Sequence, residues 1–202
     1  MADLAHRMTL ASRDTLTRGK DRMDETRELE RLMDFLENEI VRYLSVMISR
    51  GSLSEKESVR VAGLMHAAND IERIGDYCMN LSEAAMTMRN EGFGFSDTAI
   101  TELDGAFDLV GRMVDDSMQS LRDENLTLAG QVMSREDEMD DLETTLRSRH
   151  MERLNNGLCN PRSTVIFLEV LHTMERISDH CKNIAEVVAS GADYTVHQET
   201  VA

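Results

Sequence analysis

The chain has little of what builds β-rich or disulfide-bonded domains. Its 202 residues include no tryptophan, one proline and 4% aromatic residues. The three cysteines, Cys78, Cys159 and Cys181, match neither a zinc-binding spacing nor an even disulfide framework. Leucine, methionine, glutamate, arginine and alanine are abundant instead, and these residues favour helices over strands. We therefore predict an all-α fold in which Cys78 and Cys181 are small buried apolar side chains.

Basic residues are also scarce. The 22 lysines and arginines are outnumbered by 38 acidic residues, which gives a formal net charge of −16. Such a charge disfavours nucleic acid and anionic membrane surfaces, and favours cations and basic partners. The sequence has neither a run of about 18 apolar residues nor the apolar core of a signal peptide. We predict a cytoplasmic protein that meets a membrane only through a partner or through a preceding region missing from this sequence.

Apolar residues spaced three and four apart predict six long helices. In the first half they cover about 3–16, 23–49 and 54–89, and the third opens with a capping box of Ser54 and Glu57. The second helix carries an apolar stripe that includes Leu29, Leu32 and Tyr43. In the second half the helices cover about 96–121, 125–154 and 160–191, the last with Asn160 as N-cap. Residues 192–202 are expected to form a frayed tail.

The two halves repeat one another. Residues 71–83, IERIGDYCMNLSE, return at residues 174–186 as MERISDHCKNIAE, with seven identical positions. A repeat of about half the chain indicates a duplicated small domain rather than a solenoid. We predict two pseudo-symmetric antiparallel three-helix bundles, covering residues 1–91 and 96–191 and separated by the glycine-rich linker at 92–95.

Paired carboxylates occupy equivalent places in the two repeats. Residues four apart share a helix face, so each Glu-x-x-x-Asp pair stacks two carboxylates one turn apart. There are two pairs in each half: Glu30/Asp34, Glu72/Asp76, Glu136/Asp140 and Glu175/Asp179. By helical geometry the Glu72/Asp76 pair lies away from the apolar stripe, so we expect these acids to face solvent or a surface groove rather than the deep core.

Carboxylates are hard oxygen donors that suit divalent or iron cations, so the four pairs are candidate metal ligands. A ferritin-like di-iron enzyme would need Glu-x-x-His on two helices that face one core, and only Glu169 and His172 have that spacing. We therefore disfavour an oxidase. The sequence also has no phosphate-binding glycine loop or nucleophile elbow, and we predict a protein that is not an enzyme.

The doubled segments at 69–83 and 174–186, with the acid pairs on the preceding helices, resemble the repeated signature of the PhoU family. The resemblance implies two three-helix bundles, metal clusters on surface acid pairs, and a cytoplasmic accessory of phosphate transport that docks on a transporter or a sensor kinase. Three positions depart from the family pattern: Tyr77, Thr173 and Ser178.

Two functions fit this resemblance, and a third fits the acid pairs without it. The first is a regulator of phosphate transport and signalling, the second is a regulatory module of a sodium–phosphate cotransporter, and the third is metal buffering without a partner. We also predict a homodimer.

Overall fold

The computed structural model describes the backbone of residues 1–51 and 53–199, with side chains to residue 191. Within these residues there are six helices and no strand. They are α1 (Ala2–Thr17), α2 (Met23–Ser49), α3 (Glu55–Glu91), α4 (Asp97–Asp123), α5 (Leu126–Asn155) and α6 (Pro161–Glu199). The all-α prediction is confirmed. Among the described residues no helix is both long and apolar enough to span a membrane.

Local side-chain chemistry sets several helix starts. The predicted capping box at Ser54 forms, because its hydroxyl accepts from the Glu57 amide while the Glu57 carboxylate accepts from the Ser54 amide. Asn160 accepts from the Arg162 amide at 3.0 Å as α6 begins. Helix α3 ends at Gly92, which adopts φ of 73° in the left-handed region where a side chain would be strained.

The last helix is longer than its sequence suggests. We predicted its end at Gly191 and a frayed tail from residue 192, but α6 runs through Gly191 to Glu199. A glycine inside a helix costs only about 1 kcal/mol relative to alanine, so it does not stop a helix that no proline interrupts. The prediction was wrong for residues 192–199, and residues 200–202 lie outside the described residues.

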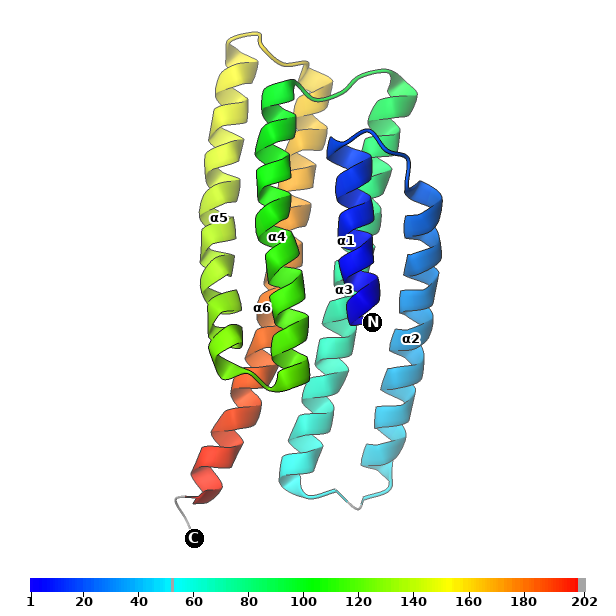
Figure 1. Cartoon of the computed structure of the whole chain (residues 1–202), viewed down its shortest axis with the longest axis vertical. Coiled ribbons are helices and arrows are strands. Elements are labelled where there is room, and N and C mark those ends of the chain that lie inside the picture. Colours follow the sequence, from blue (N-terminus) through cyan, green and yellow to red (C-terminus); the bar gives the residue numbers. More distant parts are fainter. Residues whose placement is uncertain (52, 200–202) are drawn as a thin grey trace.

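Helices α1, α2 and α3 pack on one another, and so do α4, α5 and α6. The two sets meet along α3 and α6 in the centre and along α1 and α4, and all six helices run roughly along one long axis (Figure 1). One continuous apolar core crosses this junction and contains Ile74 and Cys78 of α3 together with Ile177 and Cys181 of α6. Both predicted buried cysteines are confirmed.

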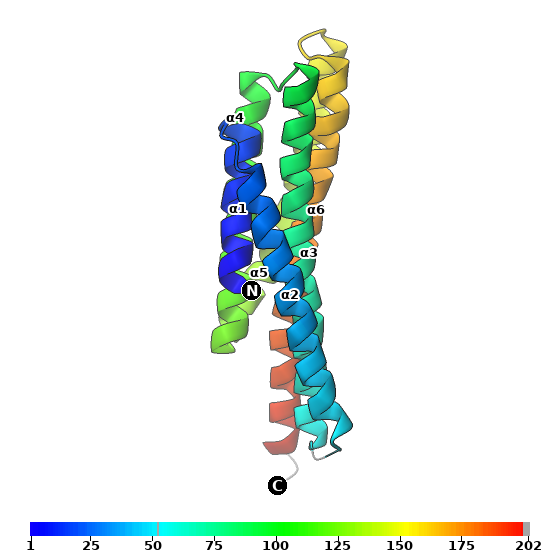
Figure 2. The ribbon, with the colours of Figure 1, turned by 90° about the vertical axis from the view of Figure 1, so that its right-hand side faces the viewer.

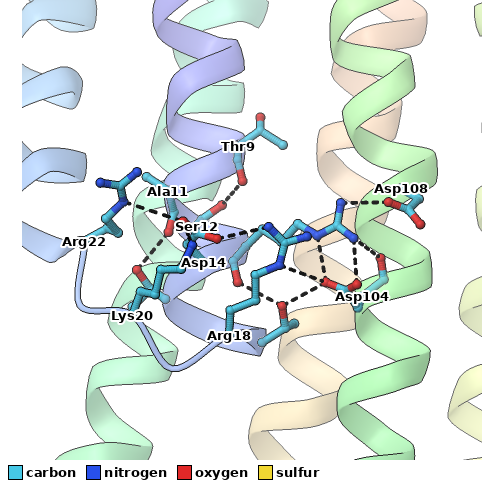
Figure 3. Close-up of polar contacts among 12 residues, drawn as sticks. Thr9, Ala11, Ser12, Asp14, Arg18, Lys20, Arg22, Asp104 and Asp108 are labelled. Carbon is cyan, nitrogen blue, oxygen red and sulfur yellow. Dashed lines mark hydrogen bonds and ion pairs between the residues drawn. The ribbon is translucent and has the colours of Figure 1, made fainter.

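Polar contacts hold α1 against α4 beside this core. The Arg13 guanidinium donates to both carboxylate oxygens of Asp104 at 2.7 Å and to Asp108 at 2.7 Å. At the end of α1, Asp14 accepts from Arg18 at 3.1 Å and from Lys20 at 2.9 Å (Figure 3). These pairs fix the end of α1 and link the two halves.

One predicted core stripe is partly wrong. Leu29 of α2 is buried, but Leu32 and Tyr43 are 45% and 66% exposed. Tyr43 lies in the later part of α2, beyond the length that α1 covers, since α1 has 16 residues against 27 in α2 (Figures 1 and 2). Leu32 lies beside α1 instead, in an open surface groove that it lines with Arg7 and the exposed Phe35.

Candidate metal centre

Helices α2 and α3 bring two predicted acid pairs together in the first half. Glu30 and Asp34 of α2 and Asp76 of α3 each offer a carboxylate oxygen, and these oxygens lie within 4.8 Å of one another. Two oxygens bound to one cation at roughly 2.0–2.6 Å can lie at most about 5 Å apart. The three groups therefore have the spacing of ligands around one ion. We call Glu30, Asp34, Glu72 and Asp76 the first acid set.

The fourth member, Glu72, stands one turn before Asp76 on α3. Its side chain is 22% exposed and that of Asp76 is 32% exposed, so both are half-buried between helices. The expectation that these acids avoid the deep core is confirmed, because they lie at the edge of the α2–α3 contact.

The fold makes the charged form of three acids, Glu30, Glu72 and Asp76, less favourable than it is in water. Burial raises the pKa of Glu30, and repulsion from Asp34 and Asp76 raises it further. Burial also raises the pKa of Glu72 and of Asp76, with repulsion between acids as a second cause. A bound cation would relieve both causes at once, since it neutralises the charge and replaces the lost solvation.

Arg73 opposes this repulsion only in part. Its guanidinium lies 3.2 Å from Asp76 and 3.7 Å from Glu72, but its side chain is 59% exposed. The pKa of Asp76 stays raised despite it. The first acid set thus keeps an excess of negative charge in a half-buried place, which is the environment that hard cations favour.

The second half does not reproduce this cluster. Helices α5 and α6 carry Glu136, Asp140, Glu175 and Asp179, which we call the second acid set. Glu136 is buried, and its Oε2 accepts from the Lys182 ammonium at 2.8 Å. Among residues 1–51 and 53–191, the first half alone supplies three metal-ligand groups within 4.8 Å.

The α6 acids nevertheless resemble their α3 counterparts. Arg176 lies 3.4 Å from Asp179, as Arg73 does from Asp76 at 3.2 Å. Burial raises the pKa of Glu175, followed by repulsion from Asp179. His172 is 56% exposed, as expected for a surface histidine, and its Nδ1 lies 3.3 Å from Glu175 Oε2.

Sequence reasoning missed two groups of residues. The first is Lys182, which the sequence analysis did not consider. It stands three residues after Asp179 on the same helix face, and the equivalent residue of the first repeat is Met79. The second group joins the halves, because Asp70 of α3 accepts from His180 Nδ1 at 2.7 Å and from Asn183 at 3.2 Å. A contact between the two repeats leaves no signal in the spacing of either one.

Comparison with known proteins decides the family. A model described as the PhoU domain matches residues 1–85 and again residues 103–188. The chain belongs to the PhoU family. Each PhoU match corresponds to one half of the fold, so the family signature is doubled just as the acid pairs are.

Curated PhoU relatives match most of the chain. The phosphate-specific transport system accessory protein PhoU homolog 1 of Thermotoga maritima is 26% identical over 161 residues, covering 80% of this chain and 68% of the relative. The PhoU homolog of Deinococcus radiodurans is 23% identical over 184 residues, covering 90% and 84%.

Solved PhoU structures share the fold. The crystal structure of PhoU from Pseudomonas aeruginosa superposes with a TM-score of 0.87 at 21% identity, covering 96% of this chain and 92% of that one. PhoU from Streptococcus pneumoniae, described as a phosphate transport system regulatory protein, superposes with a TM-score of 0.66 at 14% identity, covering 94% and 92%. These likenesses extend the PhoU assignment from sequence to the six-helix arrangement.

Proposed function

We propose that this chain is a cytoplasmic regulator of phosphate transport and phosphate signalling, which binds a metal cation and acts by docking rather than by catalysis. Membership of the PhoU family supports the regulatory role, since relatives carry the name of phosphate transport accessory proteins. The observation that carries the metal part is the first acid set, in which three carboxylate oxygens from two helices converge within 4.8 Å.

The metal part predicts a measurable loss on mutation. Protein reconstituted with Fe²⁺ or Mn²⁺ is expected to retain metal, and Glu72→Gln with Asp76→Asn is expected to lose most of it, because an amide is a weaker ligand for hard cations than a carboxylate. Elemental analysis after gel filtration measures the bound metal.

A matched control is Glu55→Gln with Glu57→Gln, which removes two exposed charges at the start of α3 and is expected to leave the metal content unchanged. Wild-type protein that holds no metal after reconstitution with iron, manganese and zinc would contradict the metal part.

Two surface properties support docking. The net charge of −16 suits a basic cytoplasmic face of a transporter or sensor kinase, and exposed Phe35 and Tyr43 offer apolar contact area on α2. Binding to the transporter's cytoplasmic parts or to the sensor kinase is expected to weaken with salt, because the Debye length shortens to about 3 Å at 1 M.

The docking experiment is a pull-down at low and high ionic strength. Phe35→Ser with Tyr43→Ser is expected to reduce binding, whereas Leu158→Ser with Val165→Ser, which removes exposed apolar side chains elsewhere, is the matched control. No partner recovered at either salt, together with unchanged phosphate uptake and phosphate-responsive expression in a deletion strain, would reject the regulator and favour metal buffering.

The cotransporter module and the homodimer are decided by separate measurements. A native reading frame that continues into membrane-spanning segments would favour the module over a free regulator. For the homodimer, light scattering is expected to give twice the chain mass of 22.8 kDa.

A further inference from the structure

Lys182 is the residue that distinguishes the two acid sets. It lies on α6 where the first repeat has Met79 on α3. Its ammonium is 2.8 Å from Glu136 Oε2, and the Glu136 side chain is 8% exposed. The contact is an ion pair between α6 and α5, in which the Lys182 ammonium donates to the buried Glu136 carboxylate.

Most other neighbours of the two sets are matched, although His172, whose Nδ1 lies 3.3 Å from Glu175 Oε2, stands where the first repeat has Asn69. Arg73 and Arg176 make matched ion pairs with the aspartate of their own helix. Burial raises the pKa of both Glu72 and Glu175. The glutamate of α2 or α5 differs more directly, because the Glu30 carboxylate lies among other carboxylates, those of Asp34 and Asp76, whereas the Glu136 carboxylate accepts a hydrogen bond from an ammonium.

An ammonium in this position works against a metal ion in two ways. It occupies a carboxylate oxygen that the ion would need as a ligand, and its own positive charge repels the ion. It also gives the buried Glu136 the opposite charge that a metal would otherwise supply.

We propose that Lys182 is an internal cation that takes the place of a metal ion in the second half, so that the chain binds metal at the first acid set alone. This inference rests on the proposed metal binding by the first set. It makes the protein functionally asymmetric although its fold is repeated.

The test exchanges the two residues between the repeats and uses Mn²⁺ alone as the probe. In the background of Glu72→Gln with Asp76→Asn, which disables the first set, Lys182→Met is expected to restore Mn²⁺ uptake by the second set. Lys182→Arg keeps the charge and is expected to restore none. In the otherwise wild-type chain, Met79→Lys is expected to weaken Mn²⁺ binding about 10- to 100-fold.

Two controls accompany these variants. Lys56→Met removes an exposed lysine at the start of α3 and is expected to change nothing, which separates the local effect from the change in net charge. Thermal unfolding in the same Glu72→Gln, Asp76→Asn background is a readout that does not depend on the first set. In chelator, adding Lys182→Met to this background is expected to lower the unfolding temperature, and Mn²⁺ is expected to raise the temperature again.

The outcomes separate this inference from the proposed function. Mn²⁺ retained by the second set with Lys182 in place would overturn the inference, and so would a Lys182→Met chain that neither gains binding nor is stabilised by Mn²⁺. If wild type binds no Mn²⁺ but Lys182→Met does, the proposed first site fails while the role of Lys182 stands.

Discussion

Ionising the partly buried acids of the first set costs free energy, which their neighbours in the fold do not offset. Glu30, Glu72 and Asp76 all have raised pKa values, chiefly through burial. A carboxyl group whose folded-state pKa is raised contributes stability that is present below its unfolded pKa and is lost as pH rises through the folded one. At neutral pH without metal, these charges therefore oppose folding. A cation bound at the first acid set, as proposed above, would remove this cost.

At the residue scale we predict that Glu72→Gln with Asp76→Asn keeps the free energy of unfolding within about 1 kcal/mol of wild type in chelator at pH 7, or raises it. The change removes like charges and leaves the exposed Arg73 free to reach solvent. Any gain is expected to disappear as the pH falls to the normal range of carboxyl groups, where wild type is also protonated. Urea unfolding across this pH range measures the effect. A collapse of the fold would instead mean that the carboxylates are buried structural groups.

At the scale of helices, the contact of α3 with α6 requires one residue without a side chain. A Cβ added to Gly63 would lie 2.9 Å from Val187 Cγ1, which is closer than packed carbon atoms come. Gly63 therefore lets the two central helices approach at a point away from the acid sets. Gly105 of α4 has nothing within 4 Å of an added Cβ and makes no such contact.

This contrast gives a prediction with a matched control. Gly105→Ala is expected to stabilise the protein by about 0.5–1 kcal/mol through helix propensity alone. Gly63→Ala is expected to destabilise it by about 1–3 kcal/mol because the clash outweighs the same gain. Adding Val187→Ala to Gly63→Ala is expected to recover most of the loss. Thermal unfolding of the four proteins checks this, and equal stabilisation by both alanines would contradict the close contact.

At the scale of the whole molecule, we expect the two halves to fold as one unit. Their apolar cores are continuous, and hydrogen bonds join the halves at both helix contacts. Arg13 of α1 bonds to Asp104 of α4, and His180 of α6 bonds to Asp70 of α3. The hydrogen bond from Arg13 lowers the pKa of Asp104. A lowered pKa contributes stability that is present above the unfolded pKa and is lost as pH falls through the folded one.

We therefore predict that Arg13→Met destabilises the whole chain by about 1–3 kcal/mol at pH 7, since it removes hydrogen bonds to two carboxylates. The difference from wild type is expected to shrink on acidification below the normal pKa of aspartate. Arg42→Met is the control, because Arg42 is 72% exposed and forms its ion pair within α2, with Glu39. Calorimetry should show a single transition in each protein. A variant in which one half melts separately would contradict the single folding unit.

Several features of the fold could be predicted from sequence because their causes are local. Ser54 and Asn160 cap helices through atoms two or three residues away, and the Gly92 break needs only a left-handed backbone. Gly191 shows the limit, since the same residue type that ends α3 is carried inside α6. A glycine permits a helix to end, but the helix ends there only where the turn that follows has a lower free energy than another helical turn.

The sequence by itself determined the all-α class, the doubled pattern and the identity of the eight candidate ligands, since helical period and repeat are properties of one chain segment at a time. Only the tertiary structure decided which acids converge. Glu30, Asp34 and Asp76 meet because α2 packs on α3. In the second acid set Glu136 of α5 pairs with the Lys182 ammonium, because α6 packs on α5. Distances between side chains on different helices depend on packing, so the same spacing of acids meets different neighbours in the two halves, with Lys182 in one repeat where the other has Met79.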